Sequence, residues 1–169
     1  PIAGDTVVIP GAFDVALSSG AQTITALTMT STGTLTISGT ASLTFTGSST
    51  ATNITVSNGT LTANAALSVS GTLRLNNAAA ILGGSGTVTV SSPITWTAGT
   101  MAGPGTTISN GTTTWSGGTI GSGRTFNNNG TMNLGGSTLN LIGTLNNNAA
   151  GTVNTANGVT LQNLTGGTG

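Results

Sequence analysis

Residues 94–148 read ITWTAGTMAGPGTTISNGTTTWSGGTIGSGRTFNNNGTMNLGGSTLNLIGTLNNN, and within them the sequence repeats itself every nineteen residues. A unit this short cannot bury an apolar face by itself, so it has to stack on neighbouring copies. The repeat therefore predicts a solenoid of successive coils, with matching residues stacked as ladders. The predicted ladders are Trp96, Trp115 and Leu134; Met101, Ile120 and Leu139; Phe126 and Leu145; and Asn127, Asn128 and Asn129 with Asn146, Asn147 and Asn148.

The same period extends over most of the chain. Toward the C-terminus, Ala149 and Ala150 lengthen one repeat to twenty-one residues. We therefore expect residues 23–169 to form the repeat coils of a single solenoid domain, residues 1–169. Two further columns continue the period toward the N-terminus: Leu35 and Ile37, then Ile54 and Val56, then Leu73 and Leu75, with Ile94 one coil further; and Val69, Val88 and Thr107 before Phe126.

Within each repeat, aliphatic residues alternate with polar ones, as in Thr34-Leu35-Thr36-Ile37. Period two indicates β-strands, and the frequent Gly, Asn and Ser residues indicate turns. Residues nineteen apart can pair only if the coils stack in parallel, so the predicted fold is all-β: a right-handed parallel β-helix with about nine coils and three short strands per coil. At about 4.8 Å per coil the rod would be about 40 Å long. A β-sandwich, the alternative, would not repeat at one fixed spacing.

The first 22 residues match the repeat poorly. They begin with the strand pattern Thr6-Val7-Val8-Ile9 and contain both acidic residues, Asp5 and Asp14. Because a repeat array needs atypical ends to cover its core, we expect residues 1–22 to form an N-terminal cap coil.

The chain is almost uncharged. It has two arginines, Arg74 and Arg124, two acidic residues and a net charge of zero. Ordinary soluble domains are about a quarter charged, so Thr, Asn, Ser and Gly have to make this surface. Two arginines cannot form a track for phosphates, so no nucleic-acid partner is expected. No apolar run approaches the length of about 18 residues needed for a membrane span, so none is predicted.

No catalytic or metal-binding chemistry is predicted. The chain has no His, Cys, Lys or Glu, so it lacks the usual nucleophile and base pairs and the soft metal ligands. Asp5 and Asp14 do not supply the several charged groups of a glycosidase groove. No Gly-Gly-x-Gly-x-Asp motif is present for calcium. We therefore expect no enzyme activity, no cofactor and no metal.

The asparagine triplets and the two tryptophans each allow two interpretations. Asparagine side chains could bind sugars, but identical asparagines in successive coils also stack their amides into a hydrogen-bonded ladder, which we favour. Trp96 and Trp115 could form an exposed platform for sugars. Their column continues as Leu134, however, which favours burial in the core.

The repeat is similar to a known group of proteins. The Gly-Thr-Leu turns, and segments such as GTLTISG (residues 33–39) and FNNNGTMNLGG (residues 126–136), resemble the repeat regions of bacterial secreted β-helix proteins. Filamentous-haemagglutinin-like adhesins and autotransporter passengers belong to this group. The resemblance covers about residues 20–165, and it implies a secreted, cell-surface protein with a structural or adhesive role.

The predicted rod has an open strand edge at each end, and free edges pair with other strands unless charge, proline or a lid blocks them. The final coils contain no charged residue and no evident lid. We therefore expect an extracellular structural protein that assembles head to tail into a homopolymeric filament or fibre. The second hypothesis is the stalk or passenger of a secreted adhesin, which would bind cell-surface glycans or host or abiotic surfaces. The third is ice binding by a threonine-rich face. The candidate assembly edges are Thr6, Val7, Val8 and Ile9 at one end and Val159, Leu161 and Leu164 at the other.

Overall fold

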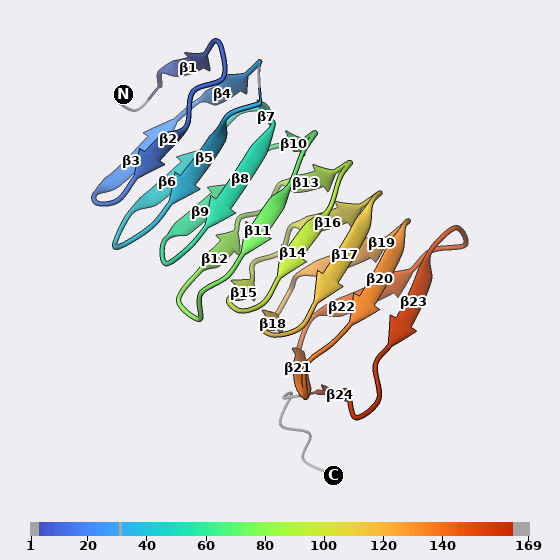
Figure 1. Ribbon diagram of the computed structural model, residues 1–169. Helices are drawn as coiled ribbons and strands as arrows, with labels where there is room; N and C mark the ends of the chain where they lie inside the picture. The colour runs from blue at the N-terminus through green and yellow to red at the C-terminus, as the bar shows by residue number, and fades with distance from the viewer. Residues whose placement is uncertain (1–3, 31, 164–169) are drawn as a thin grey trace.

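The computed structural model describes residues 4–30 and 32–163. Over these residues the chain forms 24 short strands and no helix, and the strands make three parallel sheets of eight strands each. Each coil contributes one strand to each sheet, so the coils follow one another along a rod, with β1 and β24 at opposite ends (Figure 1). The predicted parallel β-solenoid is confirmed. It has eight coils, one fewer than predicted, which gives a length of about 35 Å at the usual strand spacing.

The three sheets are called A, B and C. Sheet A consists of β1 (Thr6–Ile9), β4 (Ala26–Met29), β7 (Ser49–Ala51), β10 (Leu67–Val69), β13 (Thr87–Val90), β16 (Thr106–Ser109), β19 (Thr125–Asn128) and β22 (Thr144–Asn147). Sheet B consists of β2 (Val15–Leu17), β5 (Thr34–Ile37), β8 (Asn53–Val56), β11 (Leu73–Leu75), β14 (Ile94–Trp96), β17 (Thr112–Trp115), β20 (Thr131–Leu134) and β23 (Thr152–Thr155). Sheet C consists of β3 (Ala21–Ile24), β6 (Ser42–Phe45), β9 (Thr60–Ala63), β12 (Ile81–Gly83), β15 (Thr100–Met101), β18 (Thr119–Ile120), β21 (Thr138–Leu141) and β24 (Thr160–Gln162).

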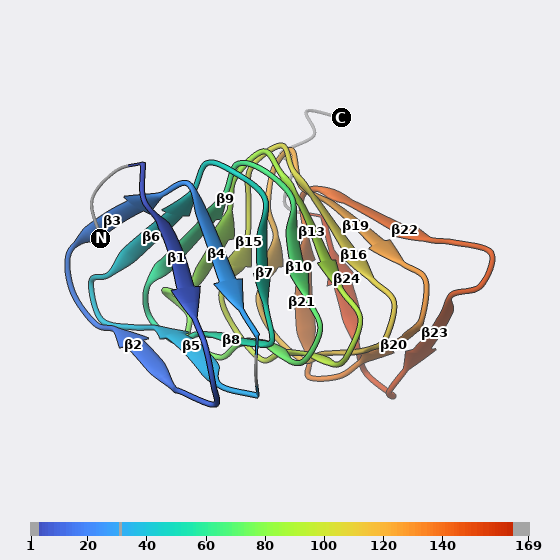
Figure 2. The ribbon, with the colours of Figure 1, turned by 90° about the horizontal axis from the view of Figure 1, so that it is seen from above.

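The register between coils is nineteen residues in the middle of the rod and varies elsewhere. From β13 to β22 in sheet A, one column of threonines pairs at nineteen residues throughout: Thr87, Thr106, Thr125 and Thr144. Ser42, by contrast, pairs with Thr60 after eighteen residues, and Thr138 pairs with Thr160 after twenty-two. Turns between strands absorb these differences, and the coils still stack as continuous turns (Figure 2).

Three of the predicted columns are wrong by two residues. Ile120 pairs with Leu141 and not with Leu139, because β21 begins with two residues, Thr138 and Leu139, that have no counterpart in β18 one coil earlier. Similarly, Val88 pairs with Leu67 and not with Val69. A shift of two keeps every side chain on its side of the strand, so the alternating pattern alone cannot reveal it. Leu139 is still fully buried and pairs with Leu161.

The third shift falls between the fourth and fifth coils. Ile94 pairs with Leu73, twenty-one residues earlier, and Trp96 pairs with Leu75. The extra residues lie in the turn after β11, where the backbone N–H of Ala79 donates to Asn77 Oδ1 (2.9 Å). Such a turn is stabilised locally by the asparagine side chain, so the insertion does not disturb the sheets.

The core lies inside the coils, between the three sheets. Strand residues alternate between buried and exposed, as in Thr34–Ile37, because successive side chains point to opposite faces. The first coil belongs to the same architecture: β1, β2 and β3 pair in register with β4, β5 and β6. Residues 6–22 of the predicted cap region, together with the end of β3, therefore extend the three sheets by one coil.

Candidate functional site: the two ends of the rod

The first coil leaves its interior open. Val7 and Ile9 of β1 and Val15 and Leu17 of β2 point inward but are only half-buried, whereas Leu27, one coil further in, is 2% exposed. In a solenoid each coil is covered by the next, so the outermost coil has a covered side and an uncovered side. The N-terminal end is therefore an apolar opening into the core, which we call the N-terminal mouth.

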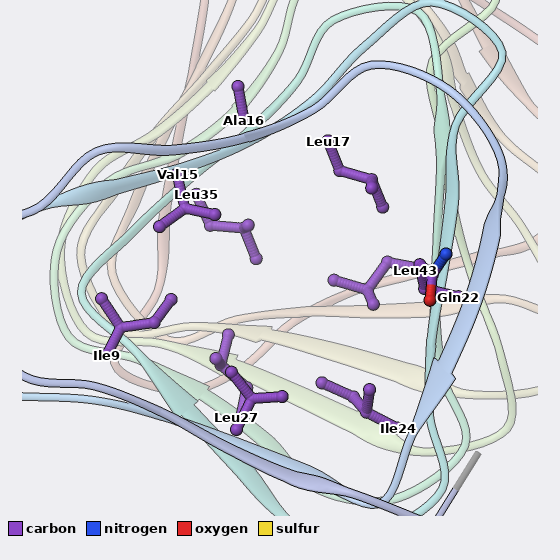
Figure 3. A pocket seen from close by; sticks show the side chains of 10 residues that line it. Ile9, Val15, Ala16, Leu17, Gln22, Ile24, Leu27, Leu35 and Leu43 are labelled. Carbon is purple, nitrogen blue, oxygen red and sulfur yellow. The ribbon is translucent and has the colours of Figure 1, made fainter. Parts of the chain in front are cut away.

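The N-terminal mouth encloses a cavity of about 150 Å³ lined by residues of β1–β6. Figure 3 shows its side chains gathered around a common space, with Val15 and Leu17 across from Ile9 and Leu27. Gln22 of β3 is the one polar side chain among them. Burying such apolar surface contributes about 25 cal/mol per Å², so the mouth is a favourable surface for association.

The outer surface of the first coil also carries exposed apolar residues. Val8, on the outward side of β1, is 58% exposed, and Phe13, in the turn between β1 and β2, is 63% exposed. Asp14, next to Phe13 in the sequence, is one of the charged residues at this end. Asp14 Oδ1 accepts a hydrogen bond from the backbone N–H of Thr34 (2.8 Å), which ties the turn to the second coil.

The last coil presents the opposite edges of the same three sheets. β23 and β24 are exposed along their whole length, and in β22 only Leu145 is half-buried. Val153 is 37% exposed and Leu161 44% exposed, while Val159 is half-buried. No charged residue occurs between Thr125 and the C-terminus of the sequence. Of the proposed assembly residues, Leu164 lies outside the described residues.

The asparagine triplets form three ladders between the seventh and eighth coils. Asn146 Nδ2 donates to Asn127 Oδ1 (2.9 Å), and Asn148 Nδ2 donates to Asn129 Oδ1. Asn128 is buried inside the coil, and its Nδ2 donates to Asn147 Oδ1 (2.7 Å). The amides therefore bond to one another, as the repeat predicts, and the ladders at the surface continue to two further pairs, Asn110 with Asn129 and Asn133 with Asn154.

The two tryptophans stack inside the rod. Trp96 pairs with Trp115, and Trp115 with Leu134, and all three are buried. The indole rings lie nearly parallel, at 8°, with their centroids 4.8 Å apart. An offset-stacked pair of this kind is favourable beyond the area it buries. Because both side chains have no exposed surface, they cannot serve as a platform for sugars.

Arg124 is the most unexpected residue of the interior, since its side chain is fully buried. Its Nε (3.1 Å) and Nη2 (2.6 Å) donate to Thr107 Oγ1, whereas Nη1 has no hydrogen-bond partner. The side chain occupies space left by glycine in the neighbouring coil: a Cβ on Gly105 would lie 2.8 Å from Nη1. Desolvation by this burial lowers the pKa of the guanidinium to about 10.

The sequence analysis missed the burial of Arg124, although a signal for it exists. Gly105 and Gly143 lie nineteen residues before and after Arg124. An arginine between two residues without side chains has room to fold inward. Thr107, which the repeat places in one column with Val88 and Phe126, is buried with them, and Ser109 and Thr113, whose burial was not predicted, are buried as well. Ser109 Oγ and Thr113 Oγ1 lie 2.8 Å apart and share a hydrogen bond.

Threonines two residues apart on one strand, which would make the threonine-rich face of the ice-binding hypothesis, occur in all three sheets, as Thr87 and Thr89 in sheet A, Thr34 and Thr36 in sheet B, and Thr60 and Thr62 in sheet C. Thr34 and Thr36 of sheet B continue as Asn53 and Thr55, and Arg74 follows in that column. The longest column of threonines in the described strands is the one in sheet A, and it is a single residue wide. Its members are Thr87, Thr106, Thr125 and Thr144, and the parallel column beside it reads Thr89, Ile108, Asn127 and Asn146.

The described part of the chain offers few groups for other chemistry. Within residues 4–30 and 32–163, no three His, Cys, Asp or Glu side chains lie close enough together to hold a metal ion. The same residues contain no helix long and apolar enough to cross a bilayer. Asp5 and Asp14 both belong to the first coil, and Arg74 lies on the outer side of β11, far along the rod.

Fold and site together define a class: a parallel β-solenoid with an ordered amide surface, an almost uncharged exterior and an apolar opening at one end. Comparison with known proteins found no matching family model, no matching curated protein and no matching solved structure.

Proposed function

We propose that this chain is a structural rod of an extracellular surface fibre and that copies of it join end to end. The observation that carries the proposal is the position of the exposed apolar residues. Among the described residues, five large hydrophobic side chains are exposed, and four of them lie in the first and last coils: Val8, Phe13, Val153 and Leu161; Ile81 is the fifth. Apolar surface concentrated at two ends favours contacts at those ends.

The chemistry of the coil ends supports the same proposal. The strands at each end have an edge whose N–H and C=O groups face away from the rod, and such edges pair with other strands unless charge, proline or a bulge blocks them. The last coil has no charged residue, and the net charge of zero gives no long-range repulsion between copies. The resemblance of the repeats to those of bacterial secreted β-helix proteins supports the extracellular location.

Electron microscopy and analytical ultracentrifugation of the purified chain test the proposal. We expect rods much longer than the single copy of about 35 Å, and their mean length should increase with concentration. Leu161→Lys places a charge in the terminal strand β24 and should abolish elongation. Thr114→Lys, on the exposed side of the central strand β17, is the matched control and should elongate normally.

Single rods at every concentration, with Leu161→Lys behaving like the unmodified chain, would contradict end-to-end association. That result would favour the second proposal, the stalk or passenger of an adhesin, in which the ladders stiffen a spacer and a different segment binds the target. Ice binding is the third proposal. It ranks last because the longest threonine column of the described strands is only one residue wide.

A further inference from the structure

We infer that the joint between copies is in register, so that each of the three sheets continues from one copy into the next. β1 of one copy would lie on β22 of its neighbour, β2 on β23 and β3 on β24. This inference rests on the proposed end-to-end association and specifies its partner surface, the last coil of a second copy. Its particular claim is that the columns inside the rod cross the joint without a shift.

The alternation along the strands restricts the register first. Val7 and Ile9 point into the N-terminal mouth, and Leu145 points into the core from β22. A slip of one residue would place Val7 and Ile9 against outward-facing residues of β22, so the inward columns would not continue across the joint. Only even shifts therefore keep the core continuous. A shift of two would leave half of each four-residue strand without a neighbour in sheet A.

The chemistry of the columns favours the unshifted arrangement. Following the observed pairing from coil to coil, Val7 and Leu145 belong to one inward column, and Val15 and Val153 to another. Unshifted stacking therefore places aliphatic side chains on each other in one inward column of sheet A and one of sheet B; in the second inward column of sheet B, Leu17 would face Thr155. In this arrangement Val7 and Val15 of the N-terminal mouth cover the half-buried Leu145 and the exposed Val153 of the last coil, which removes apolar surface from water on both sides.

In sheet C two polar residues would meet across the joint. Gln22 is the one polar side chain lining the N-terminal mouth. At the other end of the rod, Leu161 pairs with the buried Leu139, so Asn163, two residues later, follows on the same side of the chain. Unshifted stacking brings Asn163 next to Gln22 of the neighbouring copy. Amides in adjacent coils of this protein already bond to each other, as Asn128 and Asn147 do at 2.7 Å.

The column beside Val7 contains a polar residue that the joint has to accommodate. In unshifted stacking Asn147 would face Ile9 of the next copy. The Asn147 amide already makes two hydrogen bonds within its own chain, since Oδ1 accepts from Asn128 and Nδ2 donates to the Gly151 carbonyl (2.9 Å). Covering it with an aliphatic side chain therefore leaves these two bonds intact, and the cost of burial is correspondingly small.

Charge argues against the opposite arrangement, in which two N-terminal mouths face each other. Asp5 and Asp14 both lie in the first coil, so a head-to-head joint would gather four carboxylates around one interface. The last coil is uncharged, so head-to-tail stacking opposes no like charges. Repeated head-to-tail contacts of this heterologous kind extend into a filament.

Engineered cysteines test the register directly, because the chain has no cysteine of its own. Thr6 and Thr144 are exposed and occupy one outward column. In unshifted stacking, the Cα atom of residue 6 in one copy would therefore lie about 4.8 Å from the Cα atom of residue 144 in the next, which is within disulfide range. The test variant carries both Thr6→Cys and Thr144→Cys. The control combines Val8→Cys with Thr144→Cys. Val8 is exposed on the same face but two residues along, about 8 Å from Thr144 of the neighbour, which is beyond that range.

On mild oxidation we expect the Thr6/Thr144 variant to form a ladder of covalent dimers, trimers and longer species, at least about tenfold faster than the Val8/Thr144 control. Each single variant alone should stay uncrosslinked. All of the altered positions are exposed, and circular dichroism checks that each variant retains its β-structure.

Each remaining outcome overturns the inference in a recognisable way. Covalent dimers from Thr6→Cys alone would show head-to-head joints. Long rods in which the Val8/Thr144 control crosslinks as fast as the Thr6/Thr144 variant would show end-to-end association with a shifted register, which leaves the proposed function standing. The absence of long rods together with the absence of crosslinking would overturn both.

Discussion

Two neighbouring sections of the rod share one backbone but have different interiors. In residues 67–101, here called the apolar section, the described side chains buried in the core are all apolar. In residues 106–134, the mixed section, the core also contains five buried polar residues: Thr107, Ser109, Thr113, Arg124 and Asn128. The register of nineteen residues runs through the boundary between them without change.

At the boundary between the two sections, inward apolar residues pair directly with inward polar residues. Val88, Val90 and Ile94 of the apolar section pair with Thr107, Ser109 and Thr113 of the mixed section. A buried polar group is tolerated if a partner lies within reach, and here the hydroxyls and the guanidinium bond to one another. The backbone ladders thus define the coil, while the side chains inside can change from apolar to polar in a single turn.

The largest effect is expected from the tryptophan stack, which spans the boundary. Trp115→Ala should lower the free energy of unfolding by about 3–5 kcal/mol, because it removes a fully buried indole and leaves a cavity. Urea unfolding followed by circular dichroism measures it. Thr114→Ala, at an exposed position of the same strand, is the control and should change stability by less than about 0.5 kcal/mol. A loss below about 1 kcal/mol for Trp115→Ala would show that this core is not tightly packed.

The second effect concerns the charge in the mixed section. Arg124→Met should raise the free energy of unfolding by about 1–3 kcal/mol, because it replaces a buried cation that has no anionic partner with an apolar chain of similar length. Arg74→Met is the matched control: this arginine lies exposed in the apolar section, and its replacement should be nearly neutral. If Arg124→Met proves less stable than the unmodified chain, the hydrogen bonds to Thr107 outweigh the cost of burying the charge.

A smaller effect on the free energy of unfolding is expected from a change of pH. It distinguishes the contribution of the Arg124 charge from that of the packing of its side chain. Burial in the folded state lowers the pKa of Arg124 to about 10, well below its ordinary value. Above pH 10 the unfolded chain therefore binds more protons than the folded chain, so the free energy of unfolding should rise with pH, by about 1 kcal/mol at pH 11. No Lys, Tyr or Cys side chain titrates in this range. Urea unfolding at pH 8 and pH 11 should show the rise in the unmodified chain but not in Arg124→Met; an equal rise in both would assign it to another group.

The smallest effect is expected at the amide ladders on the surface. Asn146→Ala removes one exposed amide bond to Asn127 and should cost about 0.5–1 kcal/mol. Asn128→Ala, in the interior of the mixed section, removes bonds to Asn147 and to the Thr152 carbonyl and should cost more, about 1–3 kcal/mol. Equal losses at the two positions, measured by urea unfolding, would mean that burial adds nothing to the strength of the ladder.

The architecture could be predicted from the sequence because residues one repeat apart are the residues that pair between neighbouring coils. Wherever the spacing is strictly nineteen, as from Trp96 to Leu134, it gives the neighbours across coils correctly. Where a coil gains two residues, as at Thr138 and Leu139, the alternation of side chains is unchanged and the sequence pattern does not reveal the shift. The number of coils was overestimated by one, because a fixed period of nineteen was applied to the full 169 residues, whereas the eight coils occupy residues 6–162 and several of them are longer than nineteen residues.

The interior chemistry was less predictable. Threonine is usually read as an outward residue in such strands, and Thr107 and Thr113 are inward only because of the positions they occupy in their columns. Burial of Arg124 depends on the glycines of adjacent coils, a relation between residues that are distant in the chain. The N-terminal mouth is likewise a property of the stacked coil, since Val7 and Val15 become half-buried only through the pairing of β1 and β2 with the second coil.

The stacked indoles have an optical consequence. Trp96 and Trp115 are the only tryptophans of the chain, and it has no tyrosine, so nearly all absorption near 280 nm and the intrinsic fluorescence come from this one pair. At a centroid distance of 4.8 Å and an angle of 8°, the two transition dipoles couple strongly. The near-ultraviolet spectrum of the protein therefore reports the separation of two adjacent coils, and stretching or loosening of the rod can be followed without any added dye.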